Sequence, residues 1–200
     1  MPLVDAAKHI MLDALGVAAD FMGLHTAYSA SGANEITGGS PAYARKAATW
    51  NAAAAGNLDN SNAPVFDVPA GTTVAWLGLW DAVTAGTFLG MLPAGSGAPK
   101  RASVDDITTD TFDSPAHGFA NTQQVVLFAD GGSLPGGFTA GTIYFVRDAA
   151  TDTFKLAATS GGVAIDATSI GHCSVQTITP ETFAGQGTYT VSDADIALPA

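Results

Sequence analysis

Glycine and proline interrupt this chain so often that only short secondary-structure elements fit it. The 200 residues include 23 glycines and 10 prolines, and much of the hydrophobic content is alanine. In a helix interior, glycine costs about 1 kcal/mol and proline about 3 kcal/mol relative to alanine. Short apolar runs separated by such residues are typical of β-strands joined by turns. We therefore expect an all-β fold of the β-sandwich or barrel-like type.

One segment, residues 5–16, departs from this pattern and predicts a single N-terminal α-helix. Its apolar residues recur at helical spacing on one face: Ala7, Ile10, Met11, Ala14 and Leu15. Asp5 is expected to accept hydrogen bonds from the free amides at the start of the helix. Gly16 is expected to adopt the left-handed conformation that ends it.

Strand-like runs follow the helix through the first half of the chain, at residues 20–27, 43–50, 63–68, 73–81 and 88–92. The run 73–81 is apolar on both faces, which predicts a central strand with Trp76 and Trp80 in the core. It is expected to form a hairpin with the run 88–92. Gly78, inside the central run, predicts a close approach or a bulge.

At residues 93–99 the composition changes to that of a linker, and a second pattern begins. Short β runs at 124–128, 142–147, 153–157 and 174–178 are divided by glycine-rich turns, which predicts a compact barrel or sandwich. The tetrapeptide Thr-Asp-Thr-Phe occurs twice in this part, at 109–112 and 151–154.

The last segment, residues 181–192, returns to the style of the first half and is too short to fold alone. We expect residues 180–198 to complete the sheet that residues 20–92 begin. The predicted organisation is a discontinuous body, residues 1–100 plus 179–200, with an inserted small β domain at residues 101–178.

Charge and cysteine content exclude several classes of protein. With 7 Lys+Arg against 18 Asp+Glu the formal charge is -11, so the chain lacks the basic patch that direct nucleic-acid binding needs. Cys173 is the single cysteine, which excludes an intramolecular disulfide and favours a small buried residue. No stretch reaches the roughly 20 apolar residues of a membrane span, and the N-terminus lacks a basic region followed by an apolar run, so we expect neither a membrane span nor a secretory signal.

The sequence carries no catalytic signature, and we expect neither an enzyme, a cofactor nor a metal. The histidines are scattered, at His9, His25, His117 and His172, and no Gly-x-Ser-x-Gly turn or phosphate loop occurs. The acid pairs 105–106 and 193/195 are expected to be solvated rather than catalytic. The stretch 57–61 resembles a calcium loop but lacks the distal glutamate, so an Asn/Asp-stabilised turn is preferred.

Short motifs in a fixed order carry a resemblance to a known family. They are Leu24–Ala27, Gly32–Gly39, Ala42–Arg45, Phe66–Thr73, Leu77–Trp80, Gly86–Phe88 and Gly185–Tyr189. Together they resemble short tail-fibre-like or minor structural proteins of tailed bacteriophage virions. The inserted part resembles a separate phage β module, on Ser114–Phe119, Ala140–Val146 and Thr153–Leu156.

The resemblance implies a non-enzymatic component of a phage virion, assembled in the host bacterial cytoplasm. Its body would dock on other virion proteins, at the tail tip or a fibre, and its insert would be displayed outward. The resemblance also implies a homo-oligomer, with a trimer expected by analogy with phage fibres. Two alternatives stay open: a capsid decoration protein, and a host-glycan-binding adhesin or depolymerase domain. Phe119, Phe138 and Tyr144, beside glycine-rich loops of the insert, are the expected exposed contact residues.

Overall fold

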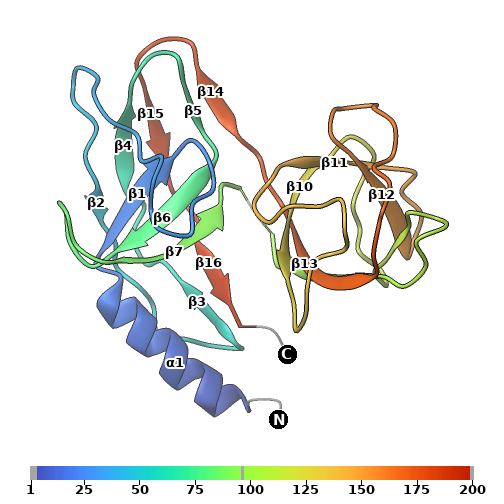
Figure 1. The fold of residues 1–200 in the computed structure, drawn as a ribbon. Coiled ribbons are helices and arrows are strands. Elements are labelled where there is room, and N and C mark those ends of the chain that lie inside the picture. Colours follow the sequence, from blue (N-terminus) through green and yellow to red (C-terminus); the bar gives the residue numbers. More distant parts are fainter. Residues whose placement is uncertain (1–3, 96, 199–200) are drawn as a thin grey trace. The chain divides into compact units, whose positions relative to one another are not determined.

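The computed structural model describes residues 4–95 and 97–198, and its fold is mainly β (Figure 1). The expected fold class is confirmed, with one α-helix, α1 (Asp5–Ala18), preceding the strands. The chain divides into two compact units. Residues 1–94 together with 180–200 form one unit, called the body below, and residues 95–179 form the other, called the barrel unit.

Among the described residues, ten strands belong to the body. They are β1 (Phe21–His25), β2 (Lys46–Ala47), β3 (Asn57–Asp59), β4 (Val65–Val68), β5 (Thr72–Val74), β6 (Trp76–Trp80), β7 (Phe88–Pro93), β14 (Glu181–Phe183), β15 (Gly187–Thr190) and β16 (Asp195–Ala197). The barrel unit contains β8 (Lys100–Val104), β9 (Phe112–Asp113), β10 (Gln124–Ala129), β11 (Tyr144–Arg147), β12 (Thr153–Ala157) and β13 (Gly171–Thr177).

The largest sheet of the body has the antiparallel order β2-β1-β6-β7. All five residues of β6 are buried, because β1 and β7 flank it and both of its faces are apolar. The predictions of a central strand, of its hairpin with β7 and of core positions for Trp76 and Trp80 are confirmed. The predicted run 43–50 is wrong in extent, since only Lys46 and Ala47 form a strand, and Trp50 makes an isolated bridge to Asn60.

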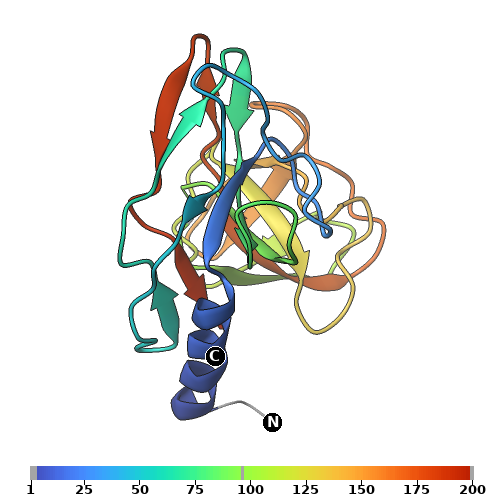
Figure 2. The same ribbon diagram turned by 90° about the vertical axis from the view of Figure 1, so that its left-hand side faces the viewer.

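The C-terminal segment pairs with the body through three separate ladders (Figure 2). Strand β14 pairs with β5, β15 with β4, and β16 with β3, all antiparallel. The expectation that this segment pairs with residues 20–92 is confirmed. The expectation that it completes the same sheet is wrong, because its strands form two-stranded ladders outside the four-stranded sheet.

The hydrophobic core of the body joins its helix, its first strands and its last strands. The largest fully buried members are Leu12, Met22, Leu24, Leu58, Phe66 and Val68. Val191 and Ile196, from the C-terminal segment, pack in the same cluster. Burying side chains from both ends of the chain makes the body depend on the C-terminal segment.

The barrel unit is a closed six-stranded barrel in the order β10-β11-β12-β9-β8-β13, with β13 pairing back to β10. Closure removes the free sheet edges that would otherwise invite pairing with another chain. Its core is separate from that of the body and is rich in aromatic rings. Cys173 is buried in this core, as predicted, and burial raises the pKa of its thiol to about 12.

Helix α1 differs from the prediction in its ends and in the face that it buries. It continues past Gly16, and Val4 is the residue that precedes it, without a side-chain cap from Asp5. The buried positions are Lys8 and Leu12, on the side opposite much of the predicted face.

Polar contacts explain this orientation of α1. His9 Nε2 accepts a hydrogen bond from the Gly56 amide at 3.1 Å, and Asp13 Oδ1 accepts one from the Ala53 amide at 2.7 Å. These bonds fix the helix against β3 and the loop before it. The sequence prediction weighed only apolar spacing and therefore selected the wrong face.

Candidate functional site

The three aromatic residues expected to make contacts are not an exposed cluster. Phe138 and Tyr144 are buried, so the expectation of exposure is wrong for both, and Phe119 is partly buried. The Tyr144 hydroxyl accepts a hydrogen bond from the Thr139 amide at 2.8 Å. The rings of Phe138 and Tyr144 pack edge to face with centroids 5.4 Å apart. The glycine-rich loops fold these rings back into the barrel core, where their burial is favourable.

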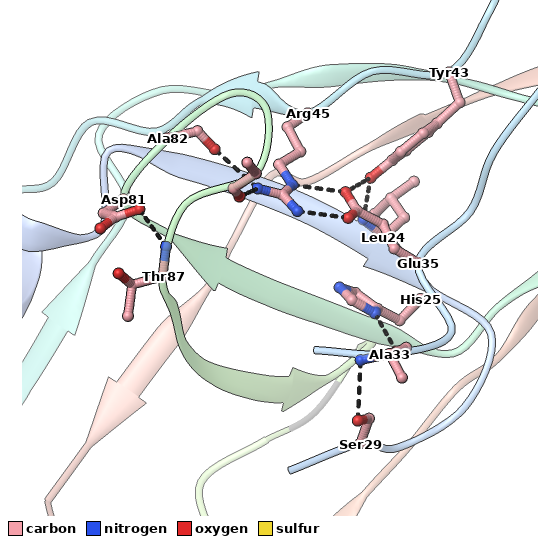
Figure 3. A network of polar contacts seen from close by, with 11 residues as sticks. Leu24, His25, Ser29, Ala33, Glu35, Tyr43, Arg45, Asp81, Ala82 and Thr87 are labelled. Atoms are coloured by element: carbon pink, nitrogen blue, oxygen red, sulfur yellow. Dashed lines mark hydrogen bonds and ion pairs between the residues drawn. The ribbon is translucent and has the colours of Figure 1, made fainter. Parts of the chain in front are cut away.

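A partly buried ion pair joins two loops of the body (Figure 3). The Arg45 guanidinium donates through Nε and Nη2 to the two carboxylate oxygens of Glu35, at 2.8 and 2.7 Å. Its Nη1 donates to the carbonyl oxygens of Ala82 and Ala85. Tyr43 donates its hydroxyl to Glu35 at 3.1 Å. The Nε, Nη1 and Nη2 donors of Arg45 all have partners inside the protein, which indicates that this ion pair holds the two loops together.

Aromatic rings pack against one side of this ion pair. The Arg45 guanidinium carbon lies 3.4 Å from the Trp80 ring centroid, and the imidazole of His25 stacks on the same indole at 6.2 Å. His25 is fully buried, and its Nδ1 lies 2.9 Å from the Ala33 carbonyl oxygen. Burial lowers the pKa of His25 below its ordinary value of 6.5. The neutral imidazole therefore donates from Nδ1 and leaves Nε2 without a hydrogen-bond partner.

The remaining histidines have structural surroundings. His117 is buried, its Nδ1 accepts the Phe119 amide proton at 2.9 Å, and its Nε2 lies 3.2 Å from the Thr153 carbonyl oxygen. The imidazole of His117 thus holds the local backbone at residues 117–119 and contacts strand β12. Among residues 4–95 and 97–198, no three His, Cys, Asp or Glu side chains are grouped so that they could hold a metal ion.

The two acid pairs behave differently. Asp106 is exposed, and hydrogen bonds from Thr108 lower its pKa. Asp195 is partly buried against Asp59 on the paired strand, and burial, Asp59 and Asp193 raise its pKa. The expectation of full solvation is therefore wrong for Asp195, whose Oδ1 is buried without a partner.

An open cavity of about 450 Å³ lies on the outer surface of the barrel unit. Its polar lining residues are Arg101, Ser103, Asp113, Asp130 and His172. Ser103 stands between Asp113 and His172 in the strand register, and Arg101 pairs with Asp130 at 2.9 Å. The Ser103 hydroxyl donates to Asp105 at 3.0 Å, so no serine–histidine hydrogen bond is formed here. Sequence reasoning missed this surface because its residues come from four separate segments.

A second cavity, of about 470 Å³, lies in the body between α1 and the loop that anchors it. Trp50 and Leu58 form its apolar part, and Asp13 and Asp20 line it with carboxylates. The Trp50 indole nitrogen donates to the Ala19 carbonyl oxygen at 2.8 Å, so that ring is held in place. The cavity borders Val17 at the exposed side of the helix.

The most unusual surface of the described residues is the outer face of α1. Val4, Ile10, Met11 and Val17 are 70%, 71%, 52% and 80% exposed. Single exposed apolar residues are common, but a continuous group indicates an interaction surface. The helical spacing of Ile10, Met11 and Ala14 predicts one apolar face of the helix, and the structure leaves these three residues exposed. No described helix is long and apolar enough to cross a membrane.

These features define a mainly β protein with one N-terminal helix and a separate barrel unit. A family model described as Podophage GP4 fiber I protein gp80 matches residues 17–117, just over half of the chain. The chain belongs to this family and is a phage tail-fibre-like structural protein. The match covers the body from the end of α1 to Ala94 and continues into the barrel unit through β9. Comparisons with curated proteins and with solved structures gave no match.

Proposed function

We propose that the chain is a non-enzymatic fibre component that docks on the virion through its body and displays the barrel unit outward. The observation that carries the proposal is the family match, which includes the whole central sheet of the body. The loop residues Arg45, Glu35 and Tyr43 support it, because their polar groups are occupied by hydrogen bonds within the body.

The partners in this proposal are other virion proteins and further copies of the same chain. The low content of charged side chains, 12%, supports contact with other subunits, because few charges must be desolvated when such surfaces meet. A trimer is the oligomer that we propose. The protein would be made in the bacterial cytoplasm and end in the particle.

Protein mass spectrometry of purified virions tests the location, and gold-labelled antibody on intact particles tests the position. We expect the chain among the particle proteins and the label at the tail. Absence from washed particles would contradict the proposal. Label spread over the head would instead favour a capsid decoration protein.

A second candidate function is glycan contact by the barrel unit, favoured by its polar cavity. Arg101, Asp113 and Asp130 offer both donors and acceptors, the groups with which proteins bind sugar hydroxyls. A glycan array of host envelope saccharides would test it. Signal that is lost in Asp113→Ala, and kept when the exposed Val163 is changed to alanine, would support this candidate.

A further inference from the structure

The cavity between α1 and the loop that faces it combines carboxylates, an aromatic ring and an exposed aliphatic side chain. We call it the helix cavity. Its lining includes Asp13 and Val17 of α1, Asp20 in the segment after α1, and Trp50 and Leu58 on the facing side. Its volume of about 470 Å³ lies within the roughly 300–1,000 Å³ that is usual for ligand-binding pockets. All of its lining residues belong to the body, so one compact unit sets its shape.

The carboxylates of the helix cavity are available to a cation. Asp20 is exposed, and no described residue forms a hydrogen bond or an ion pair with its side chain. Asp13 accepts the Ala53 amide proton with Oδ1 at 2.7 Å, which holds this carboxylate in place and leaves its second oxygen available. Among residues 4–95 and 97–198, no lysine or arginine is part of the lining. The two negative charges are therefore not neutralised from within the cavity.

The aromatic ring of the helix cavity is ordered by the body itself. The Trp50 indole nitrogen donates to the Ala19 carbonyl oxygen at 2.8 Å, and the ring is partly buried. Gly16 leaves this part of the cavity without a side chain, since a Cβ atom there would lie 3.4 Å from the Trp50 Cβ and from the Leu58 methyl carbons. An ordered ring loses little conformational entropy when a ligand packs on it.

The body contains a complete example of the chemistry that this cavity offers in part. The Arg45 guanidinium carbon lies 3.4 Å from the Trp80 ring centroid, and the Glu35 carboxylate accepts two of its N–H groups. The helix cavity has the carboxylates and the indole, and its described lining supplies no cation. A guanidinium suits such a site better than an ammonium, because its planar fork matches carboxylate oxygens and stacks on aromatic rings.

The features of the helix cavity favour a protein as the partner. Val17 is 80% exposed and offers an apolar contact for the methylene groups of a long basic side chain. Carboxylates repel the phosphates of a nucleic acid, and the net charge of -11 opposes a second copy of this chain at an acidic cavity. We infer that the helix cavity binds an arginine side chain that protrudes from another virion protein. The inference rests on the proposed docking of the body and names the chemistry of that contact.

Nuclear magnetic resonance of the full isotope-labelled chain tests this binding, with the tripeptide acetyl-Gly-Arg-Gly-amide as the probe. The indole N–H signal of Trp50, identified by its loss in Trp50→Phe, should shift with a dissociation constant of about 1–10 mM, as expected for one side chain. The same tripeptide with citrulline in place of arginine keeps the shape and lacks the charge. It should bind about 5-fold more weakly, because the ion pairs with the carboxylates are lost.

The double variant D13N/D20N removes both charges and keeps an oxygen that can accept the Ala53 amide proton. It should bind the arginine tripeptide about 5-fold more weakly than the wild type. Glu181→Gln is the matched control, because Glu181 is exposed on β14, lies outside the lining and should not affect binding. Asp20→Asn breaks no hydrogen bond within the body, so this single variant gives the same test if the double variant folds poorly.

Phage that carry the D13N/D20N chain test the cavity in the assembled particle. The number of variant chains per particle, counted by quantitative mass spectrometry, should fall at least about 10-fold, because an arginine buried at an interface would lose its partners. Phage that carry the Glu181→Gln chain should retain the wild-type number. Full incorporation of the D13N/D20N chain would overturn the inference.

Three results with the purified chain would also overturn the inference. They are equal binding of the arginine and citrulline tripeptides, tighter binding of the matching lysine tripeptide, and an unchanged Trp50 signal up to about 50 mM arginine tripeptide. Failure of the inference is separable from failure of the proposed function. A wild-type chain that is present in particles but does not bind arginine contradicts the inference alone. A wild-type chain that is absent from particles contradicts the proposed function, and arginine binding by the purified chain is measured without the particle.

Discussion

Phe112 and Phe154, which end the two Thr-Asp-Thr-Phe tetrapeptides, are partners on adjacent strands of the barrel, and their rings stack 5.2 Å apart at an angle of 8°. Both side chains are fully buried. The repeat in the sequence thus corresponds to a pair of neighbouring strands, β9 and β12. Their rings occupy the centre of a core that shares no residue with the core of the body.

Phe154→Ala should therefore destabilise the barrel unit by about 3–5 kcal/mol, the usual cost of removing a buried phenylalanine ring, and leave the body unchanged. Two probes separate the units. All three tryptophans lie in the body, so their fluorescence reports its unfolding in urea. Cys173 lies buried in the barrel unit, so labelling of its thiol reports that unit.

Phe66→Ala is the matched control, because Phe66 is equally buried in the body core. It should shift the tryptophan transition and leave thiol labelling in place. A shift of both probes by either variant would mean that the two units unfold together. That result would contradict the predicted division of the chain into a body and an inserted β domain.

The sequence predicted those elements whose pattern is local. The run 153–157 is the strand β12, and the apolar run around Trp76 is the buried strand β6, because apolar side chains on both faces leave no other placement. Strand β3 was missed, since a polar segment forms it only through pairing with β16. Which apolar residues of α1 remain exposed depends on the face of the helix that packs on the body. The hydrogen bond that His9 accepts from the Gly56 amide fixes that face.

Removing the Arg45 guanidinium should destabilise the body by about 3 kcal/mol, because it leaves the Glu35 carboxylate without its partner. The side chains of Arg45 and Glu35 are 8% and 21% exposed, so water replaces the lost bonds poorly. Arg45→Ala should lower the urea midpoint of tryptophan fluorescence by a corresponding amount. Arg45→Lys should be intermediate, because it keeps the charge but loses the paired geometry.

Lys46→Ala is the control for this prediction. Lys46 is the next residue, and its contact with Asp67 is 3.8 Å long between side chains that are 35% and 30% exposed. A pair of this kind contributes up to about 1 kcal/mol. Equal losses of unfolding free energy in Arg45→Ala and Lys46→Ala would show that the hydrogen-bonded ion pair of Arg45 has no special role in stability.

Gly78→Ala should destabilise the body by about 1–3 kcal/mol through overpacking. A Cβ atom at Gly78 would overlap the His25 imidazole and lie 3.0 Å from the Trp80 indole nitrogen. Gly90, which pairs with Leu79 on the adjacent strand, has open space where its Cβ atom would lie, so Gly90→Ala should be neutral or slightly stabilising. Urea unfolding followed by tryptophan fluorescence compares the two variants. Similar midpoints would show that the side chains around His25 move readily to accept the added Cβ atom.

His25 should make the stability of the body depend on pH below about 6.5, its ordinary pKa. Burial lowers the pKa in the folded state, so the unfolded chain binds a proton more readily, and stability falls as pH falls from 6.5 towards the folded pKa. The groups that face the ring agree with a lowered pKa. Arg45 lowers it further, and the Ala33 carbonyl and Glu35, which raise it, offset the effect of burial only in part.

His25→Asn removes this titration, and Asn is expected to keep a donor near the Ala33 carbonyl oxygen. Urea unfolding of the wild type and of the variant between about pH 5 and 8 checks the prediction, in a range where the carboxylates that stabilise most folds stay ionised. The difference in unfolding free energy between the two proteins should be constant above pH 7 and shrink below 6.5, as the wild type loses stability and the variant does not. A difference that is the same at all pH values would show that His25 is solvated enough to be protonated in the folded body.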